Sequence, residues 1–235
     1  MRKGETLVGD ALSLFLCNVN RIPQSKGGGN KKTSPKATDN NRYAGSFVKR
    51  NRRRIIVGRE DKSALNTCIC EGGAERGILE LLLDNDKLIF GWDDLLAGEI
   101  IRKRDARSFQ NEYLRMAMNK KIILYRVLDS RSEKFNLSLA YRDKVTVYNV
   151  VTAPEIEMLL IIAENKYKDF KRSGFQKPSD YCKQVLKIKG FKQKEYVKNY
   201  FKDIDRLIYV LRKYKSISRI RNSEVTISDL LRDDE

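Results

Sequence analysis

The sequence predicts an α/β protein in which a mainly parallel sheet is flanked by helices and followed by C-terminal helices. Between residues 65 and 152, short apolar runs of strand length alternate with segments of helical periodicity. Strands separated in this way by helices are typical of βαβ units. After residue 152 the pattern becomes helical. A chain of 235 residues is long enough for one main domain with smaller additions.

The strands and helices of the alternating part follow from local patterns. Apolar and β-branched runs predict strands, and apolar residues spaced three and four apart predict helices. In chain order, these patterns predict a buried strand at 65–70, a helix at 74–85, a short strand at 87–90, a mainly helical region at 93–118, a long strand at 120–129, a short helix at 132–142 and a strand at 144–152.

Three helices are predicted after the last of these strands. The first covers residues 153–173 with Pro154 in its first turn, the second covers 178–186 and the third 194–214. We expect the apolar stripe of the third helix to lie in the core; it consists of Val197, Phe201, Ile204, Leu207, Ile208 and Leu211. The opposite side of this helix is basic and carries Lys198, Lys202, Arg206 and Lys213.

Three regions with different roles are expected along the chain. Residues 1–64 are predicted to be a basic, largely disordered extension, residues 65–173 the α/β domain, and residues 174–235 a basic helical region packed on it. Within the extension, residues 23–46 have the Gly, Ser, Asn, Lys and Pro content of a disordered linker. The sequence KRNRRRII at 49–56 is either a nucleic-acid-binding arm or a solvated tail.

Positive charge is concentrated at the two ends of the chain. The formal net charge is +17, and residues 1–64 carry 15 Lys and Arg against 5 Asp and Glu, while residues 165–235 carry 19 against 10. Basic regions of this size attract polyanions because phosphate contacts release counterions. We therefore expect a nucleic acid, DNA or RNA, as a partner, although lysine-rich surfaces also serve only to keep proteins in solution.

The composition excludes several kinds of chemistry. The chain has no histidine, so that a Ser-His-Asp triad and histidine-ligated zinc are ruled out. The four cysteines show no CxxC pair, and neither a zinc site nor a disulfide framework is expected, which suits a cytoplasmic protein. No apolar run is long enough to span a bilayer, and Glu5 and Asp10 interrupt a segment that faintly resembles a signal peptide.

Carboxylates follow the predicted parallel strands at the point where each strand ends. Glu71 follows the first strand, Asp129 closes the long strand, and Glu155 and Glu157 come just after the next. Glu75 lies four residues after Glu71 and should share its side of the first helical turn. Parallel sheets bind ligands at this edge, and neighbouring carboxylates repel one another unless a cation offsets their charge. The pattern therefore predicts a site for Mg²⁺ or Mn²⁺, which prefer oxygen ligands.

Two glycines separate these first acids, and each feature also has a purely structural explanation. Gly72 and Gly73 would allow a sharp turn from strand to helix and let a phosphate approach main-chain amides. An acid in the first turn, however, stabilises a helix dipole without any metal. Glu155, three residues after Thr152, fits a capping box as well as it fits a site.

The segment EGGAE and the strand that ends in Asp129 resemble the TOPRIM domain, a Rossmann-like fold found in topoisomerases, primases and nucleases of the OLD and RloB-like type. The resemblance covers residues 65–173. It implies that Glu71 and Asp129 bind a metal and that Gly72 is the glycine of the first motif. A second glutamate four residues on, here Glu75, is typical of the OLD and RloB-like branch, as is a proline followed by an acid after the next strand, which TAPEIE resembles.

The sequence departs from the TOPRIM pattern at one place. The second aspartate of the family's DxD arrangement is missing, because Ser130 and Arg131 follow Asp129. Either Glu133 reaches the metal from the next turn, or Arg131 holds a phosphate in place of a second metal, or the site binds without catalysis.

The resemblance implies a Mg²⁺-dependent nuclease acting on phosphodiesters, with a role in defence against phages or mobile elements. Glu71, Glu75 and Asp129 would be its catalytic acids, and Glu71, Asp129 and Glu133 its metal ligands. The alternative is a non-catalytic nucleic-acid-binding or regulatory subunit that works with an ATPase partner. Phosphoryl transfer of the primase type is a third, less favoured reading, because the chain has no polymerase-like signature.

Overall fold

The computed structural model describes residues 63–102, 105–115, 120–221 and 224–232, which all belong to one compact unit. The expectations for residues 1–62, namely the basic extension, its linker and the run at 49–56, lie outside the described residues. Among the helices of the described ranges, none has the length and apolar character needed to cross a membrane.

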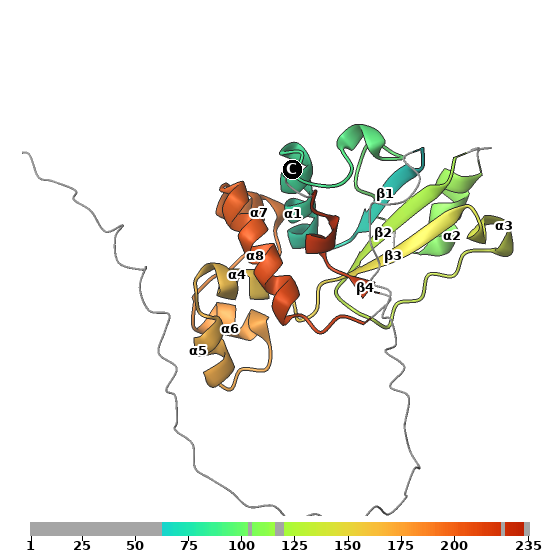
Figure 1. The fold of residues 1–235 in the computed structure, drawn as a ribbon. Coiled ribbons are helices and arrows are strands. Elements are labelled where there is room, and N and C mark those ends of the chain that lie inside the picture. Colours follow the sequence, from blue (N-terminus) through green and yellow to red (C-terminus); the bar gives the residue numbers. More distant parts are fainter. Residues whose placement is uncertain (1–62, 103–104, 116–119, 222–223, 233–235) are drawn as a thin grey trace, which may run out of the picture. The chain divides into compact units, whose positions relative to one another are not determined.

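Within the described residues, the central sheet has four parallel strands in the order β1-β2-β3-β4 (Figure 1). They are β1 (Leu65–Cys70), β2 (Ile122–Leu128), β3 (Val145–Val151) and β4 (Glu224–Val225). Cys70 lies opposite Val127, and Val127 lies opposite Val150. The carboxyl ends of β1, β2 and β3 therefore meet at one edge. The predicted α/β class is confirmed, and the sheet is consistent with a Rossmann-like arrangement.

Helices cover both faces of the sheet, which explains why all seven residues of β2 are buried. One face packs its apolar side chains against α1 (Gly73–Asp84), α4 (Met158–Ala163), α7 (Lys194–Tyr200) and α8 (Ile204–Ile217). The other face packs against α2 (Ala106–Phe109), the π-helical turn Gln110–Leu114 and Leu137. The remaining elements are the 3-10 turns Trp92–Asp94 and Ile227–Leu230, and the helices α3 (Leu139–Arg142), α5 (Tyr167–Arg172) and α6 (Pro178–Gln184).

The region between α1 and α2 differs from its prediction. The strand expected at 87–90 is reduced to a single antiparallel bridge between Leu88 and Leu231. The helix expected at 93–118 begins only at Ala106, because the preceding residues run beside β1. Ile101 donates its N–H to Cys68 O at 2.8 Å and accepts from Cys70 N at 2.9 Å. This segment satisfies the outer edge of β1, which would otherwise leave unpaired backbone groups.

Three further predicted helices begin later than expected or are interrupted. The helix at 132–142 forms only over α3. The helix at 153–173 begins at Met158, so that Pro154 lies before it, and it breaks at Asn165, whose φ is +56°. The helix at 194–214 breaks where Asp203 caps α8 by accepting a hydrogen bond from Arg206 N. Its apolar stripe is in the core as predicted, with five of the six side chains buried and Ile204 partly buried.

The sequence did not predict β4. This two-residue strand pairs with Asn149 and Val150 of β3, and a strand of that length has no recognisable periodicity. Its residue Val225 shares one hydrophobic cluster with Cys68 of β1 and Leu207 of α8. The C-terminal region thus contributes a strand to the sheet as well as helices to its cover.

The start of α1 packs closely against the loop that precedes α7. A Cβ atom on Gly73 would lie 2.4 Å from Lys192 O, a backbone oxygen that cannot move aside easily. Gly73→Ala is therefore expected to lower the free energy of unfolding by about 1 to 3 kcal/mol, as overpacking does. Gly91→Ala is the matched control, since the nearest atom to its Cβ would be 3.7 Å away. Chemical denaturation of both variants tests this prediction. Equal free energies of unfolding for Gly73→Ala and Gly91→Ala would contradict it.

Candidate functional site

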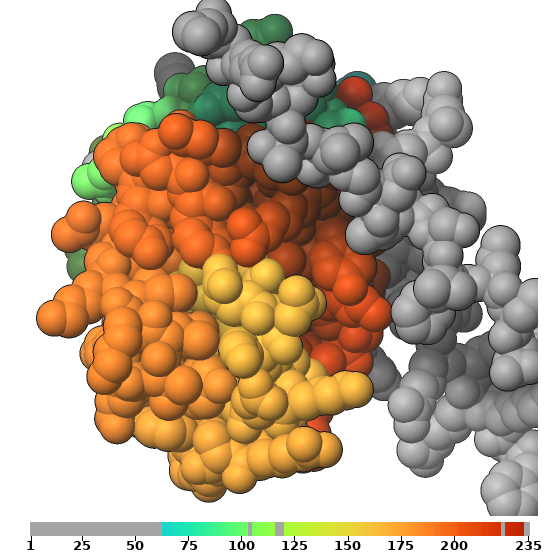
Figure 2. Space-filling view, turned by 90° about the vertical axis from the view of Figure 1, so that its left-hand side faces the viewer, coloured from blue at the N-terminus to red at the C-terminus, as the bar shows by residue number. Residues whose placement is uncertain are grey.

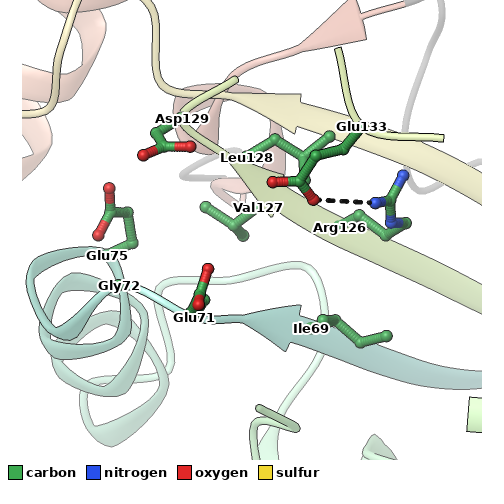
Figure 3. Close-up of a pocket in the computed structure, with 9 residues that line it drawn as sticks. All are labelled: Ile69, Glu71, Gly72, Glu75, Arg126, Val127, Leu128, Asp129 and Glu133. Atoms are coloured by element: carbon green, nitrogen blue, oxygen red, sulfur yellow. Dashed lines mark ion pairs between the residues drawn. The ribbon is translucent and has the colours of Figure 1, made fainter. Parts of the chain in front are cut away.

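Two adjoining pockets lie at the carboxyl edge of the sheet. The first, here called the acidic pocket, has a volume of about 110 Å³ (Figure 3) and is lined by Ile69, Glu71, Gly72, Glu75, Arg126, Val127, Leu128, Asp129 and Glu133. The second, here called the adjoining pocket, has a volume of about 200 Å³ and is lined by Gly72, Gly73, Ala74, Glu75, Asp129, Glu155, Ile156, Glu157 and Lys192. Gly72, Glu75 and Asp129 line both. Each of the six acids expected from the sequence lines at least one pocket.

The parallel register explains how the first acids come together. Glu71 directly follows β1 and Asp129 directly follows β2, and both side chains are exposed. Glu75 lies in the first turn of α1 and is only 9% exposed. Figure 3 shows its carboxylate pointing toward that of Asp129. The edge of the sheet and the start of one helix thus direct three carboxylates into a common space.

Gly72 makes room for one of these carboxylates. A Cβ atom on Gly72 would lie 1.9 Å from Glu75 Oε2, so that a larger residue would displace the Glu75 side chain. The backbone of Gly72 has φ −69°, which any residue can adopt. The turn was expected to require glycine's conformational freedom. Instead, Gly72 and Gly73 are required because a side chain at either position would collide with Glu75 or with the backbone of Lys192.

The carboxylates of the adjoining pocket influence one another's charge. Burial raises the pKa of Glu75; its own backbone N–H opposes this shift, and the negative charges of Glu157 and Asp129 add to it. Burial likewise raises the pKa of Glu157, with a further contribution from Glu155. Lys192 acts in the opposite direction on both groups. This accumulation of negative charge in a partly buried space is the condition that a bound cation relieves.

A divalent cation fits this site in donor chemistry and in charge. All of the acidic side chains offer carboxylate oxygens, the ligands that Mg²⁺ and Mn²⁺ prefer. Among the residues that the structure describes, however, no three acidic, cysteine or histidine side chains lie close enough together to form a ready ligand group. Binding would therefore require side chains such as those of Glu71 and Asp129, which are exposed, to turn toward a common ion.

Glu133 lies in the acidic pocket with a basic partner that was not predicted from the sequence. Its Oε2 is 3.5 Å from Arg126 Nη2, and the Arg126 side chain is 2% exposed and also donates to Asn149 Oδ1 at 3.3 Å. The guanidinium carbon is 4.5 Å from the centre of the Phe135 ring. The signal that could have found this residue is a single charge in the middle of an otherwise apolar buried strand.

Arg131 and Glu155 have partners away from the acidic pocket. Arg131 Nε donates to Glu224 Oε1 at 2.9 Å, and Arg131 Nη2 donates to Arg219 O at 2.8 Å. Arg131 lines neither of the two acidic pockets. Glu155 Oε2 accepts from Ser179 N at 2.9 Å, so that it caps α6 rather than its own helix. Arg131, at the position where the TOPRIM pattern has its second aspartate, thus links the end of β2 to β4 through Glu224.

The fold and the site define an α/β protein with a carboxylate-rich pocket at the carboxyl edge of a parallel sheet. Comparison of the chain with protein-family models, with curated proteins and with solved structures gives no match.

Proposed function

We propose that this chain is a TOPRIM-type, Mg²⁺-dependent phosphodiesterase that acts on nucleic acid. The observation that supports this function best is the convergence of Glu71, Glu75 and Asp129 on one pocket. These are the acids to which the TOPRIM resemblance assigns chemistry. Their meeting depends on the order of the strands, which the motif itself does not contain.

The four acids of the acidic pocket and the two glycines beside them each receive a role in this proposal. Glu71, Asp129 and Glu133 would hold Mg²⁺ or Mn²⁺, which would activate a water molecule and stabilise charge on the phosphorus. Glu75, held beside Asp129 by the first turn of α1, would orient the attacking water. Main-chain amides at Gly72 and Gly73, at the start of a twelve-residue helix, would bind the phosphate.

The charge of the whole chain supports a polyanionic substrate. A formal net charge of +17 favours the approach of DNA or RNA to the molecule. By analogy with RloB-like and OLD-type nucleases, the biological setting we propose is cytoplasmic defence against phages or mobile elements.

The proposal is tested by a cleavage assay on DNA and RNA with Mg²⁺ or Mn²⁺. The native chain should cut one of these substrates, and Glu71→Ala should cut it at least about a hundredfold more slowly, because a metal ligand is lost. Glu71 is exposed, so that the variant should fold as the native chain does, which circular dichroism checks. Equal cutting by the two proteins would overturn the proposal.

A second candidate function is a non-catalytic nucleic-acid-binding or regulatory subunit that works with an ATPase partner. Arg131, where TOPRIM enzymes have an acid, favours it, since its side chain is engaged with Glu224. In this case neither the native chain nor Glu71→Ala would cut nucleic acid, whether alone or with the ATPase partner, while both would bind it. Binding that weakens steeply between low and moderate salt would be the expected signature.

A further inference from the structure

A third pocket lies among the C-terminal helices and differs in character from the acidic ones. It has a volume of about 460 Å³, and we call it the basic pocket. Its apolar side includes Pro154, Met158, Tyr167 and Phe170. The helices α4 to α8, coloured yellow to orange-red, together form one face of the molecule (Figure 2). The lining residues come from several of these helices, among them α4, α5, α6 and α8.

The apolar wall of the basic pocket contains two aromatic rings, those of Tyr167 and Phe170. Phe170 is 7% exposed, and its ring meets that of Tyr181 edge-on at 5.4 Å. Met158 beside it is 2% exposed, whereas Tyr167 is only partly buried. Tyr167 is the more exposed of the two rings and offers a flat apolar group a surface on which to stack, while the buried ring of Phe170 lines the same pocket.

The remaining wall of the basic pocket is cationic. Arg131, Lys171 and Arg219 line it, and among the residues that the structure describes no aspartate or glutamate lines this pocket. Arg131 is held in place there, because its Nε donates to Glu224 and its Nη2 to the backbone oxygen of Arg219. A ligand that suits these walls combines a flat apolar part with a negative charge.

The basic pocket is joined to the acidic site through one short loop. Ala153 and Pro154 line the basic pocket, and the next residues, Glu155 to Glu157, line the adjoining pocket. Tyr214 of α8 donates its hydroxyl hydrogen to Pro154 O, which fixes the loop between them. The basic pocket and the adjoining pocket are therefore lined by consecutive residues of this loop.

We propose that the basic pocket binds an unpaired nucleotide of the nucleic-acid strand. Its base stacks on Tyr167 and Phe170, and its phosphate contacts Lys171 and Arg219. The inference rests on the proposed function and adds to it the class of substrate: a base in this pocket lies outside any duplex, so that the strand is single or locally opened.

Binding in the absence of metal tests this proposal separately from cleavage. The full chain is titrated in EDTA with a fluorescent single-stranded oligonucleotide, as DNA and as RNA, and with the matching duplex. Lys171→Glu should weaken single-strand binding about tenfold, because it reverses a charge at a phosphate contact. Lys168→Glu makes the same change on an exposed residue of α5 that does not line the pocket, and should weaken binding less than about threefold.

Photocrosslinking locates the base independently of affinity. An oligonucleotide that carries 5-iodouracil should crosslink to Tyr167 or Phe170, identified by mass spectrometry of peptides. Equal effects of the two lysine variants, tighter binding of the duplex, or crosslinks confined to other segments would overturn the proposal. So would displacement of the oligonucleotide by poly-glutamate at equal concentration, which would assign the pocket to acidic peptides. If Glu71→Ala no longer cleaves but still crosslinks at Tyr167 or Phe170, the proposed nucleotide pocket is supported. If the native chain cleaves but gives no crosslinks at these residues, the nucleotide pocket is refuted while the nuclease proposal is not.

Discussion

Asp129→Asn is expected to lower the rate of Mg²⁺-dependent cleavage by about a thousandfold, which corresponds to the several kcal/mol that a catalytic metal contributes. Asp129 lines both the acidic pocket and the adjoining pocket, and it directly follows the central, fully buried strand β2. The amide retains the size of the side chain but loses the negative charge that a divalent ion requires. Since the side chain is exposed, stability should not fall.

The readout of this prediction includes metal binding as well as rate. Calorimetric titration with Mn²⁺ should show a loss of affinity in Asp129→Asn, and this measurement does not depend on the choice of substrate. Asp143→Asn is the control, because it removes the same charge from an exposed turn after α3 that lines neither acidic pocket. Native affinity and rate in Asp129→Asn would remove Asp129 from the proposed ligand set.

Glu80→Gln is expected to lower the free energy of unfolding by about 3 kcal/mol at pH 7. The Glu80 carboxylate, 8% exposed, joins α1 to α7: it lies 2.8 Å from Arg76 Nε, 3.2 Å from Lys194 Nζ and 2.8 Å from Lys198 Nζ. Burial alone would raise the pKa of Glu80, but the hydrogen bonds from Lys198, Arg76 and Lys194 outweigh it and hold the pKa at about 2. The neutral amide would remove the carboxylate that all three cations share at short range, and would leave Lys194 and Lys198 with the longer and more exposed contacts to Glu195 at 3.7 Å and Asp84 at 3.3 Å.

The same pKa gives this effect a definite dependence on pH. The ordinary pKa of a glutamate is 4.5 and that of Glu80 in the folded protein is about 2. The stabilisation is therefore complete above pH 4.5 and disappears as the pH falls toward 2. Urea denaturation at several pH values should show the native and Glu80→Gln proteins converging in acid. Glu195→Gln, at a 76% exposed side chain 3.7 Å from Lys194, should change stability little, and a pH-independent deficit in Glu80→Gln would contradict the assignment.

The sequence predicted those parts of the fold that depend on local pattern. The apolar runs of β1, β2 and β3 are long enough to identify strands, and the parallel arrangement then places Glu71 and Asp129 at one edge. Glu75 could be placed beside them because three and four residues make one helical turn. The stripe on α7 and α8 followed from periodicity, and its burial confirms that prediction.

The features that escaped prediction depend on contacts between distant residues. Residues 95–101 run beside β1 because its backbone needs partners, and this need is not visible in their own sequence. Arg131 is bound by Glu224, 93 positions further along the chain. Similarly, Lys192 approaches the site because Gly73 allows its carbonyl to come close. Such pairings are set by the tertiary structure, and the local propensities of the residues do not specify it.

The short strand β4 has a consequence for the order in which the protein can be completed during synthesis. Its pairing with β3 and the contact of Glu224 with Arg131 come from residues that follow α8 in the chain. While a ribosome makes helices α4 to α8, the outer edge of β3 has not yet met β4, and such an edge is a template for pairing with other chains. The nascent protein therefore depends on the segment that follows α8 to cover this part of the edge, and a chain truncated after α8 would be prone to aggregate.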